Sequence, residues 1–357
     1  MTRISMPRIT RGSFGLLAGA ALLMAALTFG STTALAQFLE RRPLTLQNGW
    51  TNAPFSTSSA TVEKVSGIVQ FKGAIGNGTT AVAFTLPTGF RPATDVYVVV
   101  DLCNATKGRL HITAAGVVDI EAENGTFTNA QCFTSLDGAS FVTANNFPAL
   151  TLINGWTNAP FATSNAAAQK ISGIVHFKGA IATSGTNPDP FVMPATMRPA
   201  ADVYIPIDLC NSTTGRLHIT SAGIVDVEAE GGVFSNAQCF TSLDGVWFVS
   251  NSAGYTPLTL INGWTNAPFG TGNAAAGNAY GLVYLKGAIA TGGTNPAPFT
   301  LAPSFRPVNT TYVHVDLCNS TNGRLVIQSN GVVSVQVETD FSNAQCFTSL
   351  DGVSFVQ

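Results

Sequence analysis

Charged side chains are scarce in this sequence. Asp, Glu, Lys and Arg make up 10% of the 357 residues and give a formal net charge of −2 at pH 7. Because soluble proteins usually have about a quarter of their residues charged, a coiled-coil or long-helix protein rich in Glu and Lys is excluded. No basic cluster could neutralise a phosphate backbone, so we expect no nucleic-acid partner. Disorder is excluded as well, since 45% of the residues are apolar.

The sequence also lacks an apolar run long enough to span a membrane. Its longest one, residues 14–29, has about 16 residues, whereas a spanning helix needs about 20. Three arginines precede this run, and Ala-Leu-Ala at residues 34–36 follows it. This pattern is typical of a cleavable signal peptide. We therefore predict that residues 1–36 are removed and that the mature chain is secreted to the medium or the periplasm, with no membrane span.

One unit occurs three times in the sequence. The segment LTLQNGWTNAPF at residues 44–55 returns as LTLINGWTNAPF at 150–161 and at 258–269. The segments at 95–104 and 128–138, DVYVVVDLCN and TNAQCFTSLDG, return in related forms at the same spacing. A period of about 107 residues is too long for a solenoid or propeller repeat and has the size of a whole domain. We therefore predict three tandem domains at 44–142, 150–249 and 258–356, called repeats 1, 2 and 3.

Within a repeat the residue pattern is that of short strands. In repeat 1, residues 65–71, 83–86, 96–102, 109–113 and 117–121 have strand composition or alternate between apolar and polar residues. Alternation in 109–113 predicts that Leu110 and Ile112 point inward and that Arg109 and His111 point outward. No window has helical periodicity. We expect an all-β protein of three tandem antiparallel β-sandwich or jelly-roll-like domains of about 107 residues each.

Each repeat contains two cysteines, separated by 28 or 29 positions. Pairing inside each repeat is the one connectivity that respects the triplication, and export favours oxidation. A metal site would need a CxxC pair or nearby histidines; the sequence has neither, so we expect no metal and no cofactor. The predicted disulfides are Cys103–Cys132, Cys210–Cys239 and Cys318–Cys346.

The repeats serve as an internal comparison for catalytic residues, because a site of the common unit should occur in all three copies. His111 and His218 correspond, but repeat 3 has Val326 at that position, and the other two histidines occur in single copies. No Ser–His or Cys–His device therefore belongs to the common unit. Scattered surface histidines are preferred over a single-copy catalytic histidine, and we expect no enzyme.

Some charged residues do recur in every repeat. Two recurring carboxylates are what a glycosidase uses, but the Leu-Asp-Gly triplets are typical of turns, and a structural role is favoured. The arginine of each Gly-Arg-Leu triplet either pairs locally with an aspartate or grips an anionic or sugar ligand together with an aromatic ring. The recurring carboxylates are Asp101, Asp208, Asp316, Asp137, Asp244, Asp351, Glu123, Glu230 and Glu338.

The Asn-Gly-Trp-Thr-Asn-Ala-Pro-Phe segment is the candidate ligand site. Sugar-binding sites combine an aromatic face with side-chain amides that bond to hydroxyls. The alternative is that a tryptophan repeated in every copy belongs to the core. Trp247 occurs in one copy, and we expect it to be exposed. The predicted binding residues are Asn48, Trp50, Asn52, Asn154, Trp156, Asn158, Asn262, Trp264, Asn266 and Trp247.

The order of segments in each repeat resembles a known module. In repeat 1 they read GIVQFKGAI (67–75), FTLPTGFRP (84–92), VYVVVDL (96–102), GRLHI (108–112) and SLDGASF (135–141). They are similar to the β-rich head modules of phage tail fibres and receptor-binding proteins and of related bacterial surface proteins. The resemblance implies compact β-barrels or sandwiches, often trimeric, that recognise cell-surface saccharide. Behind a signal peptide it indicates an exported bacterial protein with three tandem copies.

We expect an exported, non-catalytic binding or adhesion protein for cell-surface or extracellular carbohydrate. Three weak sites on one chain gain avidity through effective concentration, which favours binding over turnover. A structural envelope or matrix protein is the first alternative, and a glycan-acting hydrolase is the second. The joints at 143–149 and 250–257 are only seven and eight residues long. One chain could therefore close an intramolecular pseudo-trimer, with a row of separate domains as the competing arrangement.

Overall fold

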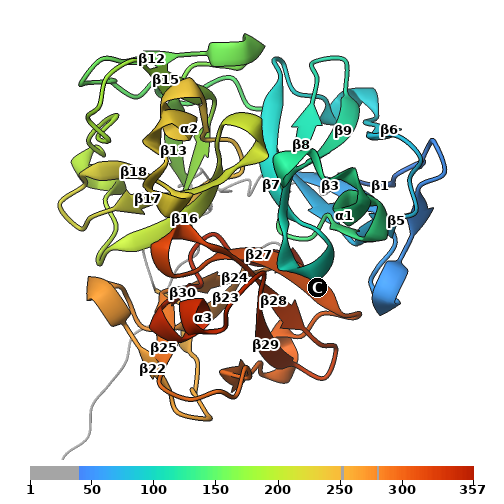
Figure 1. Ribbon diagram of the computed structural model, residues 1–357, viewed down its shortest axis with the longest axis vertical. Helices are drawn as coiled ribbons and strands as arrows, with labels where there is room; N and C mark the ends of the chain where they lie inside the picture. Colours follow the sequence, from blue (N-terminus) through green and yellow to red (C-terminus); the bar gives the residue numbers. More distant parts are fainter. Residues whose placement is uncertain (1–39, 251–252, 280) are drawn as a thin grey trace, which may run out of the picture. The chain divides into compact units, whose positions relative to one another are not determined.

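The computed structural model describes residues 40–250, 253–279 and 281–357 (Figure 1). The predicted signal peptide, residues 1–36, lies outside the described residues. All described residues belong to one compact unit. None of the helices among them is long and apolar enough to cross a membrane.

The prediction of an all-β fold is confirmed, since each repeat is built from short antiparallel strands in several small sheets. One sheet of each repeat is formed around a β-hairpin. In repeat 1 its strands are β1 (Glu40–Pro43), β3 (Thr61–Val65), β4 (Ile68–Lys72) and β11 (Ser140–Val142). In repeat 2 they are β13 (Ala167–Ile171), β14 (Ile174–Lys178) and β20 (Trp247–Val249). In repeat 3 they are β21 (Thr256–Pro257), β23 (Ala275–Ala279), β24 (Leu282–Lys286) and β31 (Ser354–Val356).

A second, three-stranded sheet begins in the Asn-Gly-Trp-Thr-Asn segment of each repeat. In repeat 1 it comprises β2 (Thr51–Asn52), β5 (Ala74–Gly76) and β10 (Thr134–Ser135). In repeat 2 it comprises β12 (Trp156–Asn158), β15 (Ala180–Thr183) and β19 (Thr241–Ser242). In repeat 3 it comprises β22 (Trp264–Asn266), β25 (Ala288–Thr291) and β30 (Thr348–Ser349).

The third sheet contains the apolar run that precedes each Asp-Leu-Cys-Asn. Repeat 1 has β6 (Val82–Thr85), β7 (Val96–Asp101), β8 (Lys107–Ile112) and β9 (Val117–Ala122). Repeat 2 has β16 (Val203–Asp208), β17 (Thr214–Ile219) and β18 (Val225–Ala229). Repeat 3 has β26 (Phe299–Thr300), β27 (Thr311–Asp316), β28 (Asn322–Ile327) and β29 (Val332–Val337). The strands β7, β16 and β27 contact one another pairwise, so the three repeats meet along them.

Side-chain alternation on β8 follows the prediction. Leu110 and Ile112 are fully buried, whereas the side chains of Arg109 and His111 keep 13% and 19% of their exposure. The outer face of this sheet is partly covered because repeat 2 lies against it through contacts described below.

Two local features differ from the sequence-based expectation. Residues 65–71 form two strands instead of one, because Ser66 (φ 53°) and Gly67 (φ 80°) turn the chain between β3 and β4. Each repeat also has a short helix, and these helices are too short to produce a recognisable apolar period. They are α1 (Phe127–Cys132), α2 (Phe234–Cys239) and α3 (Ser342–Cys346).

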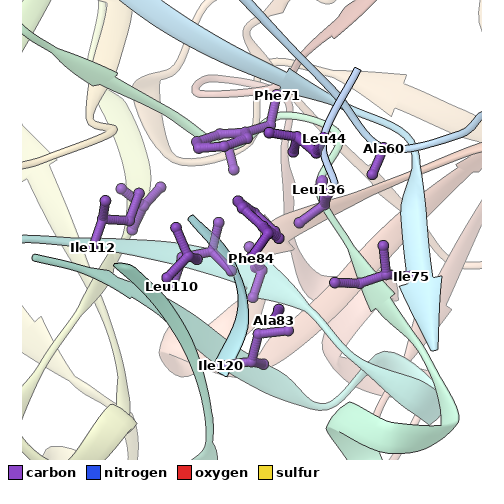
Figure 2. Packing of buried hydrophobic residues seen from close by; sticks show 14 of the residues in the cluster. Leu44, Ala60, Phe71, Ile75, Ala83, Phe84, Leu110, Ile112, Ile120 and Leu136 are labelled. Carbon is purple, nitrogen blue, oxygen red and sulfur yellow. The ribbon is translucent and has the colours of Figure 1, made fainter. Parts of the chain in front are cut away.

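Each repeat has an apolar core of its own. Figure 2 shows Phe84 of repeat 1 among Leu44, Phe71, Leu110 and Leu136, all buried. The equivalent cores of repeats 2 and 3 are separate clusters. The division into three domains at the predicted boundaries stays a prediction, since the described residues form one compact unit.

The three predicted disulfides are present. Cys103–Cys132, Cys210–Cys239 and Cys318–Cys346 each join two residues whose Cα atoms are 5.7 Å apart. Each links the end of the third sheet to the short helix, and together they account for all six cysteines of the chain. Closing a loop of this size stabilises a domain by roughly 3–4 kcal/mol in the chain-entropy model.

The Ser-Leu-Asp-Gly turns hold the repeats together. The predicted turn is present between β10 and β11, and Gly138 there has a φ of 83°. In repeat 2, Ser242 Oγ donates a hydrogen bond of 2.6 Å to the carbonyl of Tyr97 in repeat 1. A Cβ on Gly245 would lie 2.9 Å from Val98 Cγ1. The same bond runs from Ser349 to Tyr204 and from Ser135 to Tyr312. Each repeat is thus the donor to one neighbour and the acceptor from the other.

Buried ion pairs also join each repeat to both of its neighbours. Asp101, Asp208 and Asp316 end the strands β7, β16 and β27, and their side chains are fully buried. Each accepts a hydrogen bond from an arginine of another repeat. These bonds are Arg109 to Asp208 at 2.9 Å, Arg216 to Asp316 at 3.2 Å and Arg324 to Asp101 at 3.1 Å. Removing one partner of a buried pair costs about 3–5 kcal/mol, so each repeat depends on its neighbours.

Replacing Gly245 by alanine should destabilise the protein by more than backbone strain explains. Alanine at a φ of 81° costs about 1 kcal/mol. The clash with Val98 should add about 1–3 kcal/mol. Gly254→Ala is the matched control, because its φ is 85° and nothing lies within 4 Å of the added Cβ. Equal losses for the two variants in urea unfolding would contradict an inter-repeat role for Gly245.

Stability should also fall as the pH rises toward neutrality. Asp137, Asp244 and Asp351 of the Ser-Leu-Asp-Gly turns are buried, and burial raises the pKa of each to about 7, whereas the unfolded carboxyl has 3.8. Between these values the folded protein keeps protons that the unfolded chain has lost. The stabilisation is therefore fully present below about pH 4 and is lost as the pH rises through about 7.

The triple variant D137N/D244N/D351N isolates this effect. Asparagine keeps the Oδ1 that accepts the N–H of Gly73, Gly179 or Gly287. The free energy of unfolding should fall less from about pH 5 to about pH 8 in the variant than in the wild type. His176 and His314, whose pKa values burial lowers to about 4 and about 3, act in the opposite direction but equally in both proteins. An unchanged slope would show that other groups cause it.

Candidate ligand-binding site

The Asn-Ala-Pro-Phe end of the repeated segment forms a tight loop. In repeat 2 this is the turn Pro160–Ala162, in which Ala159 (φ 58°) and Phe161 (φ 53°) are left-handed. Oδ1 of Asn158 accepts the N–H of Ala166 at 2.8 Å and so fixes the loop. The loops Pro54–Ser56 and Pro268–Gly270 have the same geometry in repeats 1 and 3.

The phenylalanine of this loop is exposed in every repeat. Phe55, Phe161 and Phe269 keep 61%, 59% and 62% of their surface, with φ angles of 55°, 53° and 54°. The left-handed conformation costs a non-glycine residue about 1–2 kcal/mol. Because the ring is exposed, it also lacks most of the stabilisation that burying an aromatic side chain would give. Strained backbone and exposed apolar rings are features of functional sites. Their coincidence in three copies marks this loop as the candidate site.

In repeat 2 the exposed ring of Phe161 forms one wall of a pocket at the contact between repeats 1 and 2. This contact is called junction 1–2, and the other two contacts are named in the same way. Phe161 packs edge-on against Phe240 at 5.6 Å between ring centroids, and Phe240 packs edge-on against Tyr97 at 5.0 Å. The pocket has a volume of about 100 Å³. It is lined by Tyr97 and Arg109 of repeat 1 and by Phe161, Cys210, Asn211 and Phe240 of repeat 2.

A second, wider pocket adjoins the first. It has a volume of about 370 Å³ and shares Arg109 and Asn211 with the aromatic pocket. Its further lining includes Glu121 and Ser212. The two together make a groove that is mainly aromatic at one end and of mixed lining at the other, where Ile120 and Phe127 accompany Glu121.

Arg109 shapes this groove without bringing a free charge to it. Its guanidinium carbon lies 4.7 Å from the centre of the Tyr97 ring. Nε and Nη2 donate to Glu121 at 2.9 and 2.6 Å, and Nη1 donates to Asp208. Burial lowers the pKa of Arg109, but Asp208 and Glu121 together raise it above its usual value. The charge is thus balanced by two carboxylates, which suits an uncharged ligand.

The same arrangement occurs at the other two junctions. At junction 2–3, Phe347 packs against Phe269 at 5.8 Å and against Tyr204 at 5.1 Å. At junction 3–1, Phe133 packs against Phe55 at 5.7 Å and against Tyr312 at 4.9 Å. Arg216 and Arg324 lie over the two tyrosines at 4.7 and 4.9 Å.

The predicted tryptophans Trp50, Trp156 and Trp264 lie in the cores, each with 5% exposure. Each indole N–H donates to a backbone carbonyl of its own repeat, that of Thr80, Asn187 or Asn295, at 2.9–3.0 Å. Each ring also packs edge-on against a phenylalanine next to or within the short helix. This placement favours the alternative that the tryptophans are core residues.

The predicted asparagines are exposed and bond to the backbone. Nδ2 of Asn48, Asn154 and Asn262 donates to the carbonyls of Val82, Asp189 and Ala297. Oδ1 of Asn52, Asn158 and Asn266 accepts an N–H eight residues further on. These side chains hold the loop that presents the phenylalanine, so the segment contributes to the candidate site through its last residue.

The expectation that Trp247 is exposed is wrong. Its side chain on β20 retains 1% of its surface and packs edge-on against Tyr284 of repeat 3 at 5.0 Å. Both belong to an apolar cluster that also contains Ile174, Leu282 and Val356. The single-copy tryptophan therefore fills space between repeats 2 and 3.

The recurring aspartates that could have formed a glycosidase pair are buried. Asp101, Asp208 and Asp316 lie in the inter-repeat ion pairs. Asp137, Asp244 and Asp351 accept the backbone N–H of Gly73, Gly179 and Gly287 in their own repeats. Their positions agree with the structural interpretation that the sequence favoured.

Sequence reasoning did not select the residues of the candidate site. The phenylalanines were part of the repeated segment, but nothing in their spacing shows that they are exposed. Tyr97 and Arg109 lie on neighbouring strands of one repeat, while Phe240 comes from the next. The one available signal was the Pro-Phe step, because a large apolar residue in a Pro-rich turn has little chance of burial.

Comparisons with known proteins give only weak likeness. No family model matches this chain, and no curated protein does. Among solved structures, it is similar to the receptor-binding protein (gp15) of Listeria phage PSA, with 18% sequence identity and a TM-score of 0.26. The match covers 31% of this chain and 68% of that chain. A likeness at this level carries no argument about function.

If the exposed phenylalanine is not a structural residue, Phe161→Gly should change stability little. Glycine removes the left-handed strain, and this gain offsets the lost contact with Phe240 and the added chain entropy, to within about 1 kcal/mol. The comparison variant is Phe240→Ala, whose buried ring should cost about 3–5 kcal/mol. Thermal unfolding of both variants measures the difference, and a similar loss in both would assign Phe161 to the fold.

Proposed function

We propose that the protein is an exported, non-catalytic binding protein that holds uncharged saccharide units in the grooves between its repeats. The observation that carries the proposal is the exposed, strained phenylalanine that recurs at three junctions. Sequence evidence for a signal peptide places the protein outside the cytoplasm, and the disulfides agree with such a compartment.

The chemistry of the groove supports a sugar ligand. An aromatic face packs against the C–H groups of a pyranose, and the exposed ring of Phe161 offers such a face. Asn211, which is exposed, offers an amide group for sugar hydroxyls. Because Arg109 already bonds two carboxylates, an anionic ligand would have to displace one of them.

The cyclic contacts support a closed arrangement of the repeats. Arginine side chains reach from repeat 1 to 2, from 2 to 3 and from 3 back to 1, and the serine and glycine contacts run around the same cycle in the opposite direction. We propose that one chain thereby forms an intramolecular pseudo-trimer with three equivalent sites. Three weak sites on a rigid frame can engage a repetitive glycan together, which raises the overall affinity.

A glycan array with the mature chain tests the proposal. The triple variant F55A/F161A/F269A should lose at least about tenfold in affinity for any glycan that the wild type binds. Single and double variants should give intermediate losses, because each removes part of the avidity. Val308→Ala is the matched control, since Val308 is an apolar residue with 70% exposure that takes no part in the aromatic contacts of the junctions.

Two outcomes would contradict different parts of the proposal. If the wild type binds no glycan, the proposed function is wrong. If the triple variant binds a glycan as tightly as Val308→Ala does, the protein is a glycan binder but the junctions are not its sites.

A further inference from the structure

A histidine lies behind the tyrosine wall of two of the three junctions. His111 stacks on Tyr97 with ring centroids 4.5 Å apart and planes at 2°. His218 stacks on Tyr204 at 4.2 Å and 3°. Both histidines keep less than a fifth of their side-chain surface. Each therefore supports a ring that lines the candidate site.

Three carboxylates surround each of these histidines. Nε2 of His111 lies 3.1 Å from Asp95, and Nδ1 lies 3.9 Å from Asp119 and 3.7 Å from Glu121. A neutral imidazole carries one N–H, so one of its nitrogens would turn a lone pair toward a carboxylate. A protonated ring donates on both sides. A positive charge on the ring would therefore be attracted by all three carboxylates.

Repeat 2 has the same cluster. His218 lies 3.3 Å from Asp202, 3.7 Å from Asp226 and 3.6 Å from Glu228. Burial lowers the pKa of His218, but hydrogen bonds to Asp226 and Asp202 and the nearby Glu228 raise it above its usual value.

Two further charged groups complete the surroundings of the repeat 2 cluster. Asp189 is a further acid near Asp226, and a hydrogen bond with Asp226 raises the pKa of Asp189 to about 6. Arg216 is the cation beside the cluster, and it is bonded to Glu228 and Asp316. In repeat 1, Arg109 has the same place and bonds to Glu121 and Asp208.

The histidine cluster is connected to the loop with the exposed phenylalanine. The backbone N–H of Asp95 donates to the carbonyl of Ala162, the residue after Phe161, at 3.3 Å. In the next junction the N–H of Asp202 donates to the carbonyl of Gly270, the residue after Phe269, also at 3.3 Å. The aspartate that pairs with the histidine therefore also holds the loop from the neighbouring repeat.

Repeat 3 lacks the whole cluster. At the positions of the aspartate, the histidine and the two acids on the next strand it has Thr310, Val326, Ser334 and Gln336. Arg324 still reaches Asp101, and its Nε donates to the amide of Gln336 at 2.8 Å. Junction 3–1 thus keeps the ion pair between Arg324 and Asp101, but the histidine and the three acids around it are replaced by residues that do not titrate. Junction 3–1 is a natural control within the same chain.

We propose that junctions 1–2 and 2–3 close when His111 and His218 are protonated and loosen when they lose the proton, whereas junction 3–1 is insensitive to pH. Protonation gives the ring that bonds Asp95 or Asp202 a positive charge. A charge-assisted hydrogen bond is about twice as strong as a neutral one, so the aspartate and the phenylalanine loop that it holds are fixed more firmly. The consequence for ligand binding rests on the proposed function, and the movement of the loop does not. Under that function, two of the three sites bind more tightly in mildly acidic surroundings.

Fluorine NMR of the full mature chain tests the loop movement directly. A fluorinated phenylalanine is placed at position 55, 161 or 269, one per sample, and its chemical shift is followed from about pH 5 to about pH 9. The chemical shifts of the probes at 161 and 269 should change over this range, and that of the probe at 55 should not. The variants H111V and H218V copy the residue of repeat 3. Each should abolish the titration at its own junction and leave the other unchanged.

The results separate this inference from the proposed function. The inference is overturned if all three probes titrate, if none does, or if the titration persists in the valine variants. This holds whatever the protein binds. If the array has identified a glycan, its affinity should be about threefold or more higher at about pH 6 than at about pH 8, and the double variant H111V/H218V should remove that difference. If no glycan binds but the two probes titrate, the proposed function fails and the pH-dependent junctions stand.

Discussion

A carboxylate buried at the end of the central strand of each repeat needs a cation from another repeat. Asp101, Asp208 and Asp316 end the strands β7, β16 and β27, which contact one another, and their side chains are fully buried. An isolated repeat would expose its aspartate or leave it without the arginine. The Ser-Leu-Asp-Gly turns fit the same contact, because their glycines admit the neighbouring strand where any side chain would clash. Association of the repeats is therefore part of the fold.

The candidate site follows from this association. The arginine that crosses to the neighbour also covers a tyrosine of its own repeat, and the neighbour supplies two phenylalanines beside it. One residue thus balances the buried charge and shapes the groove, which leaves the groove aromatic and uncharged. The loop that adds the exposed ring is held by an asparagine and anchored near a buried tryptophan. Residues that resemble a sugar site in the sequence form its support in the structure.

The three repeats have the same backbone arrangement but differ at some buried positions between them. Lys107, Thr214 and Asn322 occupy one equivalent position, and each is buried with a different set of partners. The lysine bonds to Asp208, whereas Thr214 donates to Asn322, which in turn donates to Glu123 and Glu338. The histidine cluster of repeats 1 and 2 is a second difference of this kind. Because of such substitutions, junctions with the same backbone geometry have different charged and titratable groups.

The sequence by itself determined the all-β class, the three copies of the unit and the disulfide pairs, because strand alternation, a period of about 107 residues and paired cysteines are local or repeated patterns. It also identified the Leu-Asp-Gly turns and the inward side of β8. It did not find the short helices, the burial of Trp247 or the site itself. Phe161, Tyr97 and Phe240 come from two repeats, and only the tertiary structure shows which repeats meet. The contact between repeats depends on the shapes of their surfaces and on buried charged residues, and neither produces a recognisable pattern in the sequence.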